Sequence, residues 1–242
     1  MSEVRALLFD TFGTLVDWRT GLITQLEQWG AGNNITADWT GLALAWRRDH
    51  VPALAEVRAG KREWANHDAL QAETMSKLAP QFGLPTLGDD TLGQLAKMWH
   101  HLPGWPDTAE GMALLRTKYL VAPLSNGTVA LLMSLARTAR ITFDAVFGSD
   151  VFRQYKPDPK TYLGAVNLLG CAPGEVMFVA SHPSDLESAA GCGLKTCYVS
   201  RPLEYGEGVV VEQEPADGDF DLMVGDLVEL ATVLRCEAPQ YH

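Results

Sequence analysis

The sequence is poor in cysteine, with four in 242 residues, and no two of them form a CxxC pair. No histidine stands at zinc-finger spacing from them, so we expect neither a disulfide framework nor a structural zinc site. Residues 1–8 contain one arginine and no long apolar run, which argues against a secretory signal. No stretch reaches the roughly 18 to 20 apolar residues that a membrane helix requires. We therefore expect a cytoplasmic protein that does not enter a membrane.

Positive charge is also scarce, because 19 Lys and Arg residues stand against 30 Asp and Glu residues, a formal net charge of −11. A net anion repels phosphate backbones, so we expect no nucleic-acid partner. A chain of this length can bury a core without a disulfide or metal, and its 47% hydrophobic and 20% charged residues are typical of a globular protein. These features exclude classes of protein but do not select a function.

The order of apolar segments predicts an α/β fold with a helical insertion. The short apolar run Arg5–Phe9 is typical of a buried strand, and helical spacing then dominates residues 20–101. From about residue 106 short apolar runs alternate with helical segments, which indicates a parallel sheet covered by helices. We predict a Rossmann-like α/β core domain, residues 1–16 and 104–242, and an inserted helical cap domain, residues 17–103.

The individual elements follow from the same spacing. Further strands are expected at Tyr119–Leu124, Ala145–Phe147, Val176–Ala180 and Lys195–Val199. Helices of the cap are expected at Gly21–Trp29, Trp39–Arg48, Trp64–Leu78 and Leu92–His101. Helices of the core are expected at Ala109–Thr117, Thr128–Thr138, Lys160–Leu169, Asp185–Cys192 and Gly225–Leu234.

Four polar segments stand near the expected ends of strands: Asp10–Thr14, Ser125–Gly127, Lys156–Asp158 and Ala180–Asp185. Ligand sites of open α/β sheets lie beyond the carboxyl ends of the strands. Any one of these segments alone is also typical of a turn or a helix cap. All four in this order indicate a catalytic site much more specifically.

The order D-x-F-G-T, L-S-N-G, Y-K-P-D-P-x-x-Y and S-x-x-x-D resembles that of the haloacid dehalogenase-like superfamily. Within it, the sequence is most similar to the type II (S)-2-haloacid dehalogenase branch, which includes enzymes acting on fluoroacetate. The resemblance runs over nearly the whole chain and includes the pair Trp46 and Arg47. It implies a hydrolase without cofactor or metal that converts a small anionic 2-halo acid to the 2-hydroxy acid, and it allows a homodimer.

The resemblance assigns the displacement step to four residues. Asp10 is the expected nucleophile, which forms a covalent ester that water later cleaves. Arg47 would stabilise the departing halide, because it is an always-charged donor. Ser125 would bind the substrate carboxylate and position Asp10, and Asn126 would face the leaving group. Backbone N–H groups of Thr11, Phe12 and Asn126 could serve the same oxyanion.

Other residues are expected to support hydrolysis and binding. Lys156 would neutralise the clustered carboxylates and keep Asp10 ionised, and Asp185 would orient the hydrolytic water. Tyr162 matches a family tyrosine near the substrate, Thr14 belongs to the nucleophile loop, and Trp18 would wall an apolar pocket.

Two positions decide between alternatives. Related phosphatases have an acidic residue where this chain has Phe12, so a magnesium-dependent phosphatase is disfavoured. The best-known dehalogenases have asparagine where this chain has His182, which would narrow the site or share proton transfer with Asp185. Ring opening of a strained acid such as azetidine-2-carboxylate stays open, because it needs the same nucleophile. A non-catalytic binding protein is a further alternative.

Overall fold

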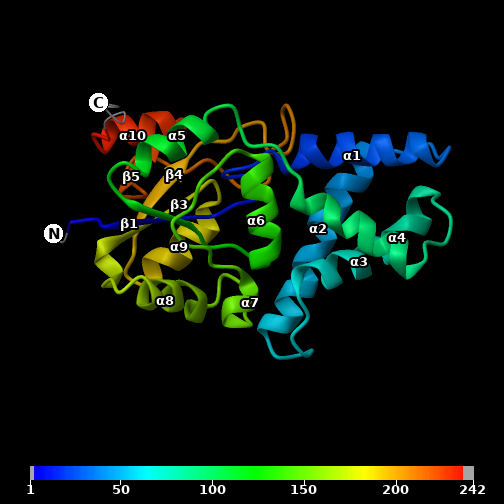
Figure 1. Ribbon diagram of the computed structural model, residues 1–242, viewed down its shortest axis with the longest axis horizontal. Coiled ribbons are helices and arrows are strands. Elements are labelled where there is room, and N and C mark those ends of the chain that lie inside the picture. Colours follow the sequence, from blue (N-terminus) through cyan, green and yellow to red (C-terminus); the bar gives the residue numbers. More distant parts are fainter. Residues whose placement is uncertain (1–2, 237–242) are drawn as a thin grey trace.

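The computed structural model describes residues 3–236, so the first two and the last six residues of the predicted core domain lie outside it. Five parallel strands form one sheet in the order β2-β1-β3-β4-β5 (Figure 1). Their bounds are β1 Ala6–Phe9, β2 Leu120–Pro123, β3 Val176–Ala180, β4 Lys195–Val199 and β5 Leu222–Val224. The predicted α/β fold class is confirmed.

Helices cover both faces of this sheet, which explains why its strands are apolar without alternation. In β1, Leu7 and Phe9 belong to one hydrophobic cluster and Ala6 and Leu8 to another, because successive side chains point to opposite faces. The first face is covered by α5 Thr108–Leu115, α6 Val129–Thr138 and α10 Leu227–Val233. The second is covered by α8 Pro159–Leu168 and α9 Pro183–Gly191, with α7 Ser149–Phe152 and the 3-10 turn η3 Pro173–Glu175 nearby.

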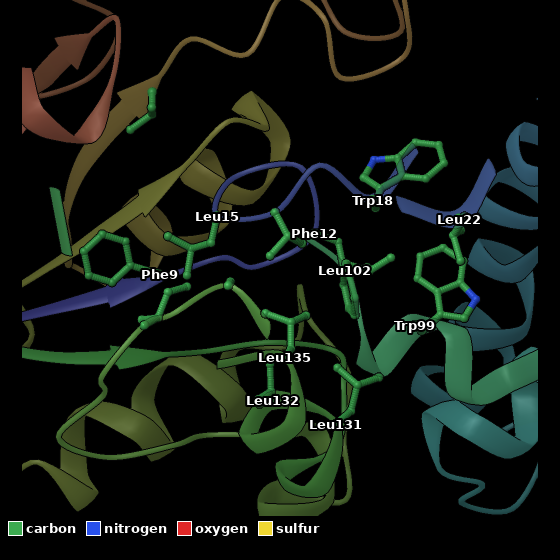
Figure 2. Packing of buried hydrophobic residues seen from close by; sticks show 14 of the residues in the cluster. Phe9, Phe12, Leu15, Trp18, Leu22, Trp99, Leu102, Leu131, Leu132 and Leu135 are labelled. Atoms are coloured by element: carbon green, nitrogen blue, oxygen red, sulfur yellow. The ribbon is translucent and has the colours of Figure 1, made fainter. Parts of the chain in front are cut away.

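The helical insertion between β1 and β2 lies to one side of the sheet (Figure 1). It comprises α1 Trp18–Gly32, α2 Trp39–Arg58, α3 His67–Leu78, η1 Ala79–Phe82, α4 Asp89–Ala96 and η2 Lys97–His100. Figure 2 shows that one apolar cluster continues from Phe9 through Phe12 to Trp18 and Trp99. The insertion therefore packs beyond the carboxyl end of β1 and shares one hydrophobic core with the sheet. Within residues 3–236 no helix is long and apolar enough to cross a bilayer.

One strand prediction was wrong, and one strand was missed. Residues 145–147 form only an isolated parallel bridge, Leu124 to Phe147, because too few residues run alongside β2 to make a ladder. The strand β5 was not predicted, since it has three residues and follows a long polar loop. Helix α2 also continues through Pro52 beyond its predicted end, and the predicted helix over 92–101 divides into α4 and η2.

Replacing two glycines by alanine should change the free energy of unfolding in opposite directions. At Gly111 in α5 a Cβ atom would lie 2.4 Å from Leu227 Cβ and 2.7 Å from the Leu227 carbonyl carbon, so Gly111→Ala should cost about 1–3 kcal/mol by overpacking. Gly93 in α4 is exposed with nothing within 4 Å, so Gly93→Ala should gain about 0.5–1 kcal/mol. Urea unfolding measures both, and equal effects would contradict this packing of α5 on α10.

Candidate active site

The predicted polar segments meet at the carboxyl edge of the sheet, beside α2. Asp10 follows β1, Asn126 follows β2, His182 and Asp185 follow β3, and Lys156 lies in the loop before α8. A cavity of about 820 Å³ opens at this edge. Its predicted site residues are Asp10, Phe12, Arg47, Asn126, Lys156, His182 and Asp185.

Lys156 lies between two carboxylates at the base of the cavity. Its Nζ donates to Asp10 Oδ1 at 2.8 Å and to Asp185 Oδ2 at 2.5 Å. Tyr162 donates its hydroxyl proton to the other oxygen of Asp185. Lys156 is 5% exposed, and the attraction of Asp10 and Asp185 outweighs burial and raises its pKa. The ammonium is therefore a fixed positive charge shared by both carboxylates.

The two carboxylates differ in their environments. Burial alone would raise the pKa of Asp10, but Lys156 and then His182 outweigh it and hold that pKa well below its usual range. For Asp185, burial is the largest influence and Asp10 adds to it, so the pKa of Asp185 is raised although Lys156 opposes the shift. Asp10 is thus suited to act as an ionised nucleophile and Asp185 as the group that accepts a proton.

The second oxygen of Asp10 is fixed by the loop that follows it. Thr14 Oγ1 donates to Asp10 Oδ2 at 3.0 Å, and Thr14 itself accepts the backbone N–H of Ser181 at 3.0 Å. Gly13 has φ +93°, a left-handed conformation that brings the loop back toward Asp10. The segment D-x-F-G-T is therefore a tight turn that orients the carboxylate.

Arg47 projects from α2 and packs over two aromatic rings, of which Phe12 lines the cavity and Trp18 lies behind it. Its guanidinium carbon lies 5.8 Å from the Phe12 ring centroid and 5.6 Å from that of Trp18. Burial would lower the pKa of Arg47, but Tyr205, Glu204 and Asp10 together raise it. The neighbouring Arg48 is exposed and pairs with Asp49. The sequence prediction that Arg47 faces the site is consistent with this arrangement.

Five predicted site residues lie behind the cavity rather than on its wall: Thr11, Thr14, Trp18, Ser125 and Tyr162. Ser125 is 2% exposed, and its Oγ accepts the backbone N–H of Gly127 at 3.2 Å. Asn126 Oδ1 accepts the backbone N–H of Lys156 at 2.7 Å, which ties the loop after β2 to the lysine loop. These residues support the groups that face the cavity.

Trp18 was expected to wall the pocket, and the structure gives it a different contact. Its indole is fully buried, lies against Trp99 and Tyr205, and donates Nε1–H to Glu204 Oε1 at 2.9 Å. Figure 2 shows Trp18 and Trp99 on adjacent helices of the insertion. The tryptophan therefore holds an acidic residue in place behind the cavity.

Glu204 and Tyr205 were missed by the sequence analysis. Glu204 is 4% exposed and lies on the loop between β4 and β5, where its carboxylate is 3.0 Å from His182 Nε2. The opposite ring nitrogen, His182 Nδ1, is 3.3 Å from Asp10 Oδ2. The expected sharing of protons between His182 and Asp185 was wrong, because the two ring nitrogens of His182 face Asp10 and Glu204 instead. No local motif surrounds Glu204 that could have pointed to it.

A metal site was not predicted. In the part of the chain that the structure describes, no three His, Cys, Asp or Glu residues gather in a way that could hold a metal ion. Lys156 Nζ lies between the two carboxylates nearest the cavity. That the reaction uses no metal or cofactor stays a prediction.

Comparison with known proteins identifies the family. The family model for haloacid dehalogenase-like hydrolases matches residues 4–193. The chain belongs to this family. The (S)-2-haloacid dehalogenase of Xanthobacter autotrophicus is 31% identical over 207 residues, covering 82% of this chain and 76% of that protein. The solved structure of an L-2-haloacid dehalogenase is 42% identical, with a TM-score of 0.91 over 96% of this chain and 99% of the other. A defluorinating L-2-haloacid dehalogenase is 39% identical, with a TM-score of 0.92 over 96% of both.

These similarities confirm the predicted resemblance to the haloacid dehalogenase branch of the family. Phe12 takes the position where family phosphatases were expected to have an acid. Its ring stacks on His67 at 5.5 Å between centroids and meets Trp99 edge-on at 5.5 Å. The position therefore supplies an apolar surface and no proton donor.

The Lys156 cluster predicts a pH-dependent loss of stability. Lys156→Met should lower the free energy of unfolding by about 3–5 kcal/mol near neutral pH, because two buried carboxylates lose their cation. The lowered pKa of Asp10 stabilises the fold above its unfolded-state pKa of about 4, and this contribution disappears as the pH falls through the folded pKa. The difference between variant and wild type should therefore shrink toward acid pH.

Urea unfolding over a pH series measures this difference. The exposed Lys160, four residues further on, supplies the matched control Lys160→Met, which should have little effect at any pH. If the free energy of unfolding of Lys156→Met stays below that of wild type by the same amount at every pH, lost packing rather than lost charge explains the effect of the substitution.

Proposed function

We propose that this chain hydrolyses short 2-halo carboxylic acids to 2-hydroxy acids through a covalent ester on Asp10. The observation that carries the proposal is Lys156, which bridges Asp10 and Asp185 in a cavity that Arg47 and Phe12 also line. The similarity to (S)-2-haloacid dehalogenases and to a defluorinating relative supports the choice of substrate class.

In the first step, a carboxylate oxygen of Asp10 attacks C2 of the substrate from the face opposite the halogen. A C–O bond forms as the C–halogen bond breaks, and the halogen leaves with the bonding pair. Arg47 and Asn126 both line the cavity and can donate hydrogen bonds, so both are suited to receive the halide. The lowered pKa of Asp10 keeps the nucleophile ionised, and the apolar surface of Phe12 helps to exclude water.

In the second step, water attacks the carboxyl carbon of the ester rather than C2. Asp185 accepts a proton from that water, for which its raised pKa suits it, while Tyr162 and Lys156 keep it in position. The ester bond breaks, the 2-hydroxy acid takes a proton back, and Asp10 is restored. The two carboxylates thus act in different steps.

An anionic substrate is compatible with the negative chain because the cavity itself carries positive groups. Arg47 and Lys156 both line it, although the net charge of the chain is −11. We also propose the division into a core, 1–16 and 104–242, and a cap, 17–103, with the substrate bound where Arg47 of the cap faces Asp10 of the core. Whether the protein forms a homodimer stays a prediction.

The leaving group separates this proposal from its alternatives. A halide needs donors, and Arg47 is a permanently charged one. The amine of a strained ring would need a proton instead. A phosphate ester would need an acidic side chain at the position that Phe12 takes. A test incubates the protein, without added metal, with chloro-, bromo- and fluoroacetate, both 2-chloropropionate enantiomers and azetidine-2-carboxylate. Halide release by wild type and none by Asp10→Ala is expected; ring opening alone would overturn the proposal.

Arg47 supplies a second test. Arg47→Gln should lower kcat by about 100- to 1,000-fold, the usual loss when one donor to a developing anion is removed. The loss should be larger for fluoride than for bromide, because fluoride binds hydrogen-bond donors more strongly. Arg137→Gln removes an exposed charge from α6, away from the cavity, and should leave kcat unchanged. Equal losses in both variants would indicate a general charge effect instead.

A further inference from the structure

His182 lies between two buried carboxylates. Its Nδ1 is 3.3 Å from Asp10 Oδ2, and its Nε2 is 3.1 Å from Glu204 Oε1 and 3.0 Å from Glu204 Oε2. The three side chains are 13%, 10% and 5% exposed for His182, Asp10 and Glu204. Ionised carboxylates are acceptors only, and a neutral imidazole has one N–H donor whereas an imidazolium has two. Both contacts are hydrogen bonds only if His182 is charged.

Glu204 is held in place from three sides. Trp18 Nε1 donates to it, and the absence of a side chain at Gly13 makes room for it, since a Cβ there would lie 2.3 Å from Glu204 Oε1. Its loop is anchored by Arg201. The guanidinium of Arg201 donates hydrogen bonds of 2.7 and 2.8 Å to the Asp107 carboxylate and one of 3.1 Å to the Thr14 carbonyl. This carboxylate is therefore built into the fold beside the nucleophile loop.

The charged groups around His182 come from several elements. Asp10 and Glu204 face its two nitrogens, and Tyr205 lies on the same loop as Glu204. Beyond them, Arg47 of α2 interacts with Glu204, and Lys156 holds the other oxygen of Asp10. Burial would lower the pKa of His182, but Glu204 and Asp10 raise it well above its usual range.

We propose that Glu204 is a positioning residue that keeps His182 charged, and that His182 is a catalytic residue that donates Nδ1–H to Asp10 Oδ2 throughout the cycle. This inference rests on the proposed function. Oδ2, already held by Thr14 and His182, stays the carbonyl oxygen of the ester, while Oδ1 forms the bond to C2. When water bonds to the carboxyl carbon, the π pair moves onto Oδ2, where the imidazolium stabilises the oxyanion.

The remaining atoms of this step balance in the same scheme. The proton lost by the attacking water passes to Asp185. Collapse of the oxyanion re-forms the carbonyl and breaks the bond between the carboxyl carbon and Oδ1, which leaves on the product and takes the proton from Asp185. The proton of the new Asp10 carboxyl group goes to solvent. His182 keeps its proton in every step, so it acts by charge and not by proton transfer.

The experiment measures ester formation and ester hydrolysis separately, by rapid quench and mass spectrometry of the intact protein over a pH series. Glu204→Gln keeps the shape of the side chain but removes its charge, so the alkaline limb of ester hydrolysis should move down by about 1–3 pH units. His182→Asn should lack that limb, and the double variant should match His182→Asn because Glu204 acts through His182. Glu214→Gln, an exposed residue of the same loop, should match wild type.

A magnetic-resonance titration of the six histidines in the free protein tests the charged state without any turnover. The resonance missing in His182→Asn should stay that of an imidazolium above neutral pH, and should titrate lower in Glu204→Gln. A neutral His182 at neutral pH overturns the inference, as does an unshifted alkaline limb in Glu204→Gln, or a loss confined to ester formation. If wild type releases no halide from any haloacid, the proposed function and the role of His182 in it both fail, and the titration still decides the charge.

Discussion

The contact of Lys156 with two buried carboxylates is the interaction on which the site depends. Asp10 and Asp185 come from different strands and would repel each other in one cleft, so a cation between them is needed for both to be buried. The backbone of Lys156 is fixed as well: its N–H donates to Asn126, and its carbonyl accepts from Arg58 of α2 at 3.1 Å. One residue thereby joins the ends of β1, β2 and β3 to the helical insertion.

Around this contact the buried charges alternate in sign. Asp10, Asp185 and Glu204 supply three carboxylates, and Lys156, His182 and Arg47 supply three cations near them. The surplus of acidic residues that gives the chain its charge of −11 is therefore not a property of the cleft. This explains how an acidic protein can offer a binding site to a small anion, and why removing one member of the cluster leaves its neighbours without compensation.

Much of this site follows from the sequence because its parts are strand ends. Asp10 comes directly after an apolar run, Asn126 and Asp185 follow such runs within a few residues, and parallel strands bring those ends together. Glu204 is different, since it lies on an irregular loop and reaches the site only because Arg201 and Trp18 hold it there. The contacts of His182 depend on that same loop, so the sequence pointed to the wrong partner. The three-residue strand β5 and the single bridge at Phe147 carry too few residues for a pattern to predict either correctly.

The central claim is that Asp10 becomes covalently bound to the substrate. A single turnover in heavy-oxygen water, with enzyme in excess over a 2-halo acid, tests it most directly by mass spectrometry of the peptide that contains Asp10 and of the released 2-hydroxy acid. The account predicts that the label enters the Asp10 carboxylate and that the first product carries the original carboxylate oxygen. Label in the first product with none in Asp10 would show direct attack of water on C2 and contradict the account.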